Sequence, residues 1–130
     1  MRTGKKGPGK GAPKVRTYVD KTWQAAHRGR PAEGILVEIV GGPMDGDRRR
    51  VRKPSLTIGR GEHNDVVLLL DPSVSTEHAR IVADQGQFWI EDLGSTNGTF
   101  LGEARISGRT LIGAGSVFVV GRTTLELLPS

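Results

Sequence analysis

Three polar, glycine-containing segments carry most of the side chains that could bind an anion. They are residues 59–65 (GRGEHND), 71–78 (DPSVSTEH) and 92–99 (DLGSTNGT). Each combines guanidinium, hydroxyl or amide donors with residues that form tight turns. A phosphorylated side chain bears nearly two negative charges and three acceptor oxygens, so it needs several such donors at close range. The three segments are therefore candidates for one phosphate-binding site.

Arg60, Ser75 and Thr96 are the strongest candidates for direct contact with a phosphate. The planar guanidinium of an arginine matches phosphate geometry, and the two hydroxyls are neutral donors. A single arginine is most often a solvated surface residue. The flanking glycines and the two other polar segments favour a binding role for Arg60.

The same segments also suggest an enzyme or a metal site, and the spacing argues against both. Asp71, Ser75 and His78 could be joined into a hydrolase triad, but Ser75 is not in a nucleophile-elbow sequence. His27, His63 and His78 lack metal-ligand spacing, and the chain has no cysteine. We therefore expect a protein without catalytic residues, metal or cofactor.

Short alternating segments separated by turn residues predict how these loops are positioned. From Ile35 onward no stretch has a helical period, and in residues 88–91 apolar side chains alternate between two faces. We expect an all-β fold, a sandwich of two antiparallel sheets. The expected strands are 35–40, 48–52, 56–59, 65–70, 79–83, 88–93, 99–101, 116–120 and 124–128.

The loop motifs resemble those of the forkhead-associated (FHA) domain family over residues 35–128. The matching residues, in the family's order and spacing, are Gly59-Arg60, Ser75-x-x-His78, Ser95-Thr96-Asn97-Gly98-Thr99 and Leu111-x3-Gly115-x5-Gly121. The resemblance implies a β-sandwich of about eleven strands. It also implies that loops at one end of the sandwich bind phosphothreonine peptides.

The resemblance also implies a role for each matching residue. Arg60 and Ser75 would bind the phosphate, with Thr96 beside it. Asn97 would bind the peptide backbone on either side of the phosphothreonine. Thr76 follows the serine where many family members carry a longer polar side chain. Its hydroxyl can still donate to the phosphate, but over a shorter reach, so Thr76 is a further candidate for phosphopeptide binding.

Three further residues would support the site rather than touch the ligand. In the family, the histidine that matches His78 braces the loop that carries the serine. Gly59 and Gly98 are interpreted as backbone positions where a Cβ would interfere.

The positive charge of the chain is concentrated before the predicted domain. Residues 1–30 hold nine Lys/Arg and one acidic residue, whereas residues 31–130 hold ten Lys/Arg and thirteen acidic residues. We expect a disordered basic tail over 1–14, and a linker over 15–34 with a short amphipathic helix at 15–27. The tail could attract nucleic acid, but the domain has no base-reading motif, which argues against that partner.

The resemblance to FHA domains, together with the chemistry of the three loops, implies a phosphothreonine-binding module that recruits or senses substrates of a Ser/Thr kinase. No apolar run approaches the ~20 residues of a membrane span, and we expect a cytoplasmic protein without a membrane partner. The alternative is a structural adaptor that assembles a complex without phosphate. Thr17 and Thr22 are candidate phosphorylation sites through which the domain could capture its own tail.

Overall fold

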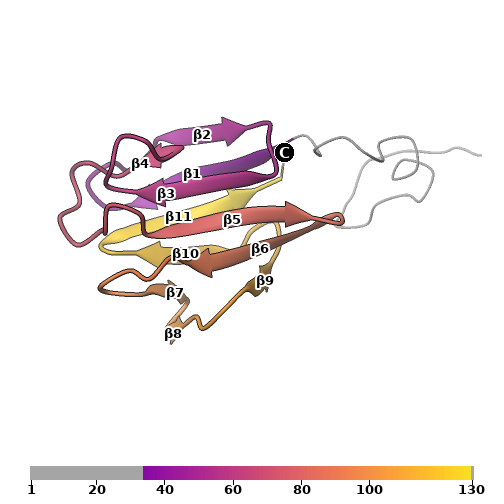
Figure 1. The fold of residues 1–130 in the computed structure, drawn as a ribbon. Helices are drawn as coiled ribbons and strands as arrows, with labels where there is room; N and C mark the ends of the chain where they lie inside the picture. Colours follow the sequence, from indigo (N-terminus) through magenta and orange to yellow (C-terminus); the bar gives the residue numbers. More distant parts are fainter. Residues whose placement is uncertain (1–33, 130) are drawn as a thin grey trace, which may run out of the picture. The chain divides into compact units, whose positions relative to one another are not determined.

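The computed structural model describes residues 34–129, which form eleven β-strands and no helix (Figure 1). The strands are β1 (Ile35–Gly41), β2 (Arg48–Val51), β3 (Ser55–Gly59), β4 (Val66–Val67), β5 (Ala79–Asp84), β6 (Gln87–Asp92), β7 (Thr99–Leu101), β8 (Ala104–Arg105), β9 (Thr110–Ile112), β10 (Val117–Val120) and β11 (Thr123–Leu128). The expected tail at 1–14, the helix at 15–27 and the two candidate threonines lie outside the described residues.

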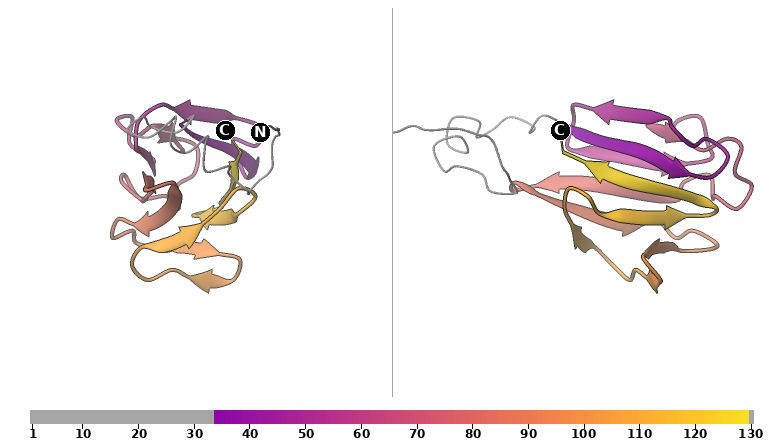
Figure 2. Two further views of the ribbon diagram at one scale, coloured as in Figure 1. Left: turned by 90° about the vertical axis from the view of Figure 1, so that its right-hand side faces the viewer. Right: turned by 180° about the vertical axis from the view of Figure 1, so that it is seen from behind.

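The strands form two sheets, as predicted. One has six strands in the order β2-β1-β11-β10-β7-β8, and the other has five in the order β4-β3-β5-β6-β9. Figure 2 shows the two sheets as facing layers. The strand pairs are antiparallel apart from the two-residue contact of β3 with β4, which is parallel. The all-β sandwich with eleven strands is thus confirmed.

Alternating apolar residues of both sheets fill the space between the layers. Phe88 and Ile90 of β6 lie on one face and Trp89 and Glu91 on the other, as the sequence predicted. Fully burying one aliphatic or aromatic side chain contributes about 1.5–3 kcal/mol. The largest fully buried apolar side chains are Phe118, Ile35, Leu56, Ile58, Leu68, Ile81, Ile90, Leu125 and Leu127.

The strand expected at 65–70 is shorter than predicted. Only Val66 and Val67 form β4, and the backbone then turns, with the Asp71 amide bonded to the Leu68 carbonyl at 3.2 Å. Leu68 is fully buried, whereas Leu69 and Leu70 are exposed. The run of apolar residues therefore divides between a strand and a turn.

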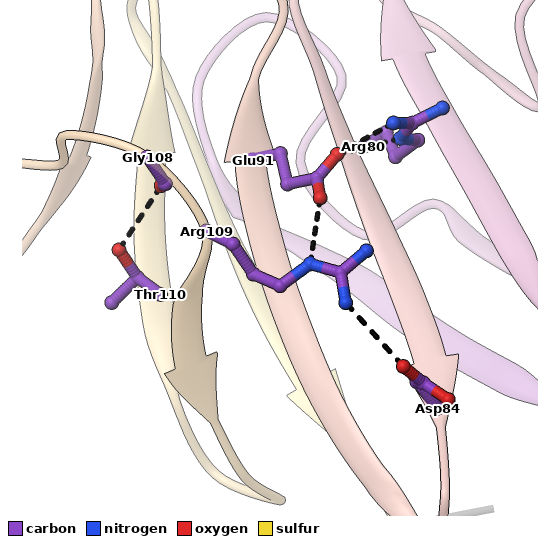
Figure 3. A network of polar contacts seen from close by, with 6 residues as sticks. All are labelled: Arg80, Asp84, Glu91, Gly108, Arg109 and Thr110. Carbon is purple, nitrogen blue, oxygen red and sulfur yellow. Dashed lines mark hydrogen bonds and ion pairs between the residues drawn. The ribbon is translucent and has the colours of Figure 1, made fainter.

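Charged side chains of β5, β6 and the residue before β9 form a network (Figure 3). Glu91 accepts hydrogen bonds from Arg80 and from Arg109, each at 2.8 Å, and Arg109 also reaches Asp84 at 3.4 Å. The two arginines hold the pKa of the Glu91 carboxyl below its usual range. The cations of this surface are therefore already paired with carboxylates.

The topology brings the three polar segments to one end of the sandwich. β3 ends at Gly59 and β6 ends at Asp92, whereas β5 begins at Ala79 and β7 begins at Thr99. Because neighbouring strands run in opposite directions, these strand ends lie at the same end of the sandwich. The loops lie at the left of Figure 1, opposite the end where the described chain begins.

Candidate functional site

Arg60 follows β3 directly, and its guanidinium is fixed by the neighbouring loop. Its backbone N–H donates to the Ser75 carbonyl at 2.9 Å, and its Nε donates to the Val74 carbonyl at 2.9 Å. The side chain is exposed and forms no ion pair within residues 34–129. A guanidinium has five N–H donors, so the Nε bond leaves the four Nη donors available for an anion.

Ser75 lies where two of the loops meet. Its Oγ accepts the backbone N–H of Thr96 at 3.0 Å, which links the segment 71–78 to the segment 92–99. Since a hydroxyl can accept and donate at once, the Ser75 proton is left for a further acceptor. The backbones of Arg60 and Ser75 are adjacent, since the Arg60 amide bonds to the Ser75 carbonyl.

His78 is fully buried and connects the same two loops through its ring. Nδ1 accepts the Ser75 backbone N–H at 3.0 Å, and Nε2 donates to the Gly98 carbonyl at 2.8 Å. An amide can only donate and a carbonyl can only accept, so these bonds define the Nε2–H tautomer. The ring contacts the backbone of Ser75 rather than its hydroxyl, so the two residues are not arranged as nucleophile and base.

Asp92 organises the turn that presents Thr96 and Asn97. Its carboxylate accepts the backbone N–H groups of Gly94 and Ser95 at 3.0 Å, the Ser95 hydroxyl at 2.6 Å and the Thr99 hydroxyl at 2.7 Å. Burial raises the pKa of Asp92, but these hydrogen bonds outweigh it, and the pKa lies below its ordinary value. The side chain of Thr96 is exposed at the tip of this turn.

Asn97 and Asp71 hold the remaining loop in place. Asn97 is exposed, and its Nδ2 donates to the Ser73 carbonyl at 2.9 Å. The buried Asp71 carboxylate accepts the N–H of Ser73 at 3.0 Å, the N–H of Arg122 at 2.8 Å and the hydroxyl of Thr123 at 2.7 Å. Burial opposes ionisation of Asp71, yet these donors lower its pKa from the ordinary value.

Gly59 and Asn64 bring the Thr76 backbone close to β3. A Cβ at Gly59 would overlap the Thr76 carbonyl and the Asn64 amide, so the close approach requires glycine. The Thr76 carbonyl accepts the Gly61 N–H at 3.1 Å and the Asn64 Nδ2 at 2.8 Å. The Thr76 side chain is exposed beside Ser75.

The turn at Gly98 also depends on glycine. Gly98 has a φ of 89°, a conformation that other residues rarely adopt. A Cβ there would overlap the guanidinium of Arg105, which places that exposed cation against the turn next to Asn97.

Every candidate site residue in the described region, from Gly59 to Gly98, lies in these three connected loops. Sequence reasoning missed the roles of Asp71, Asp92 and Asn64. The signal for Asp92 was an aspartate two and three positions before Gly94 and Ser95, a spacing typical of turns capped by a side chain. Within residues 34–129, no three His, Asp or Glu side chains gather as a metal site, and none of the described segments is a helix able to cross a membrane.

The lowered pKa values of Asp71 and Asp92 predict acid sensitivity. Their ordinary pKa is about 3.9, so the unfolded chain binds these protons at higher pH than the folded one. Their contribution to stability is therefore present above about pH 4 and is lost as the pH falls through the lowered values.

Melting temperatures measured from pH 7 to pH 2 test this, with Asp71→Asn and Asp92→Asn as variants. Both variants should be less stable at pH 7 and should lose less stability on acidification. If the melting temperatures of the variants fell with pH as steeply as that of the unchanged protein, the acid sensitivity would not come from Asp71 and Asp92.

Comparison with known proteins agrees with the loop motifs. The family model of the FHA domain matches residues 56–121. The FHA domain-containing protein FhaB of Mycobacterium tuberculosis is 34% identical over 108 residues, which cover 83% of this chain and 68% of FhaB. A solution structure of an FHA domain from Arabidopsis thaliana superposes with a TM-score of 0.68 at 31% identity, covering 78% of this chain and 93% of that one.

A further solved structure comes from a structural and functional analysis of phosphothreonine-dependent FHA domain interactions. It has a TM-score of 0.65 and 27% identity, and it covers 75% of this chain and 97% of that one. The FHA family model and the similarity to FhaB agree with the loop motifs. The chain therefore belongs to the forkhead-associated (FHA) domain family.

Proposed function

We propose that residues 35–128 form a non-enzymatic module that binds phosphothreonine-containing segments of other proteins. The observation that carries this proposal is the Arg60 guanidinium, which forms no ion pair within residues 34–129 and is held by the carbonyl of Val74, the residue before Ser75. A similar domain takes part in phosphothreonine-dependent interactions. The partners would be substrates of a cytoplasmic Ser/Thr kinase.

In this proposal the donors divide between the phosphate and the peptide backbone. The Nη groups of Arg60 and the hydroxyl of Ser75 donate to the phosphate oxygens, with the exposed hydroxyls of Thr76 and Thr96 beside them. Asn97 donates one amide N–H to the Ser73 carbonyl, so its second N–H and its Oδ1 are available to a peptide backbone. The loops are held in register by Gly59, His78 and Gly98.

The proposal is tested with three versions of one peptide that differ only at the central residue. The phosphothreonine peptide should bind, the unphosphorylated threonine peptide should not, and the phosphoserine peptide should bind about fourfold more weakly. One buried methyl group contributes about 0.8 kcal/mol, which corresponds to that factor, and β-branching adds to it by limiting the side-chain rotamers.

Isothermal calorimetry distinguishes the outcomes. Equal affinity for the phosphorylated and unphosphorylated peptides would favour the phosphate-independent adaptor instead. Equal affinity for phosphothreonine and phosphoserine would show that no group of the domain recognises the methyl.

We also propose that the module is regulated by its own N-terminal segment through phosphorylation of Thr17 or Thr22. Thr17 precedes Ile35 by 18 positions, and an extended chain of that length spans up to ~60 Å. The linker is therefore long enough for a phosphorylated Thr17 to reach the loops of the domain. A short tether gives the attached segment an effective concentration of order millimolar at those loops. Even a weak self-ligand would then exclude external peptides.

The expected result of phosphorylating these threonines is a shift of the amide signals of Arg60, Ser75 and Asn97 that does not depend on protein concentration. The external phosphopeptide should bind more weakly at the same time. The double variant Thr17→Ala/Thr22→Ala, treated with the same kinase, serves as the control. Shifts that grow with protein concentration would indicate binding between molecules, against the intramolecular switch.

A further inference from the structure

Strand β2 forms a cationic edge on the six-stranded sheet, away from the loops described above. Five of the six residues from Arg48 to Lys53 are arginine or lysine, and all five are exposed. β2 pairs with β1 alone, so its other side is an edge of the sheet. Edge strands offer backbone N–H and C=O groups to an additional strand.

The carboxylates of the domain neutralise only part of this charge. Arg48 pairs with Glu38 at 3.3 Å, and Lys53 pairs with Asp65 at 2.8 Å. Arg49 and Arg52 form no ion pair among the residues that the structure describes. The edge therefore carries excess positive charge that a partner could complement.

A hollow of about 320 Å³ adjoins this edge, between β2 and β4. Its lining consists of Val37, Ile39, Met44, Asp47, Arg48, Arg49, Val66 and Val67. The register places Arg49 opposite the buried Val37, so Arg49 lies on the core-facing side of β2, at the hollow. The hollow thus combines five apolar side chains with two arginines and one carboxylate, that of Asp47.

We propose that the β2 edge binds an extended acidic segment of another protein, which adds to the six-stranded sheet as a further strand. Backbone hydrogen bonds to β2 align the segment, and one apolar side chain enters the hollow on the core-facing side. The carboxylates of the segment then lie on the outer face of the sheet, on the side of Arg50 and close to Arg52, which follows β2. Side chains of a strand alternate between two faces, so a segment that alternates acidic and apolar residues satisfies both requirements.

Charge selects this occupant over the two that the chain itself could supply. Residues 1–30 hold nine Lys/Arg and one acidic residue, so the N-terminal segment is repelled by β2. A second copy paired edge to edge would bring arginine against arginine, which destabilises a strand pair. Nucleic acid complements the charge but has neither a peptide backbone for the edge nor an aliphatic side chain for the hollow.

The experiment uses the full chain and a labelled peptide of about ten residues that alternates glutamate and valine. A peptide of the same length that alternates glutamate and glycine carries the same charge without apolar side chains. The test variant is Arg50→Glu/Arg52→Glu, which reverses the charge on the side where the carboxylates are expected. The matched control, Lys5→Glu/Lys6→Glu, makes the same charge change in the N-terminal segment.

We expect the glutamate–valine peptide to shift the amide signals of Arg48–Val51 and to slow their hydrogen exchange, while those of Arg60 and Ser75 stay unchanged. The test variant should weaken this binding by at least about tenfold, because attraction becomes repulsion at two positions. The control variant should keep its affinity within about twofold. The test variant should still bind the phosphothreonine peptide, which shows that it is folded.

Three results would overturn the proposal. The first is an absence of shifts at about 1 mM peptide, which would leave the arginines as protection against edge-to-edge pairing. The second is equal binding of the glutamate–glycine peptide or equal weakening by the control variant. The third is displacement of the peptide by single-stranded oligothymidylate at lower concentration, which would identify a general polyanion surface.

Discussion

Arg60→Ala is expected to weaken binding of the phosphothreonine peptide by at least about tenfold, with little effect on folding. The substitution removes one or two charge-assisted hydrogen bonds to the phosphate, each worth roughly 1.5–3 kcal/mol. The side chain of Arg60 is exposed, and within the domain its removal costs only the hydrogen bond to the Val74 carbonyl. The melting temperature should therefore fall by a few degrees at most.

Two further variants define what Arg60 contributes. Arg60→Lys keeps the charge but loses both the planar fork and the Nε bond, so its affinity should lie between those of the alanine variant and the unchanged protein. Arg109→Ala removes another arginine, one that carboxylates of β5 and β6 already hold (Figure 3), and should leave peptide binding unchanged. Calorimetry that shows undiminished binding by Arg60→Ala would end the assignment.

His78→Ala is expected to lower the free energy of unfolding by about 3–5 kcal/mol and to abolish peptide binding. The substitution leaves a cavity and two unpartnered groups, the Ser75 N–H and the Gly98 carbonyl. Each buried unsatisfied group costs about 1–3 kcal/mol, and the cavity adds to this. Binding is lost because the ring joins the loop of Ser75 to the loop of Asn97.

Urea unfolding of three variants measures this effect. His78→Asn retains an acceptor near the Ser75 N–H and should be less damaging than alanine. His63→Ala removes an exposed histidine that pairs with Glu77 and should change stability by less than about 0.5 kcal/mol. A loss below about 1 kcal/mol for His78→Ala would show that the ring is not the brace of the loops.

Several strands that the sequence predicted have a clear apolar alternation. β11 buries every second residue, and β1 and β5 do so in their first part, a pattern that is visible without any structure. β8 and β9 were missed because they are two and three residues long, and β8 is fully exposed. Their pairing depends on neighbouring strands rather than on their own composition.

The three loops of the candidate site could be identified from the sequence, but the hydrogen bonds within and between them could not. Motif spacing placed Arg60, Ser75 and Asn97 in loops that the fold brings together. Nothing local indicates that Asp71 bonds to Thr123, 52 positions later, or that Arg60 is fixed by a backbone carbonyl 14 positions away. Such contacts follow from how the two sheets pack, and a pattern within one segment does not reveal them.

The pairing of β1 with β11 has a mechanical consequence. Leu36 lies opposite Leu128, so the described chain enters and leaves the domain through adjacent strands, at the end opposite the loops. A pulling force applied across these two points would load the hydrogen bonds of the pair one after another, starting there. The domain should therefore yield to tension by peeling of β1 from β11, and the end that carries Arg60 and Ser75 would be the last part of that seam to open.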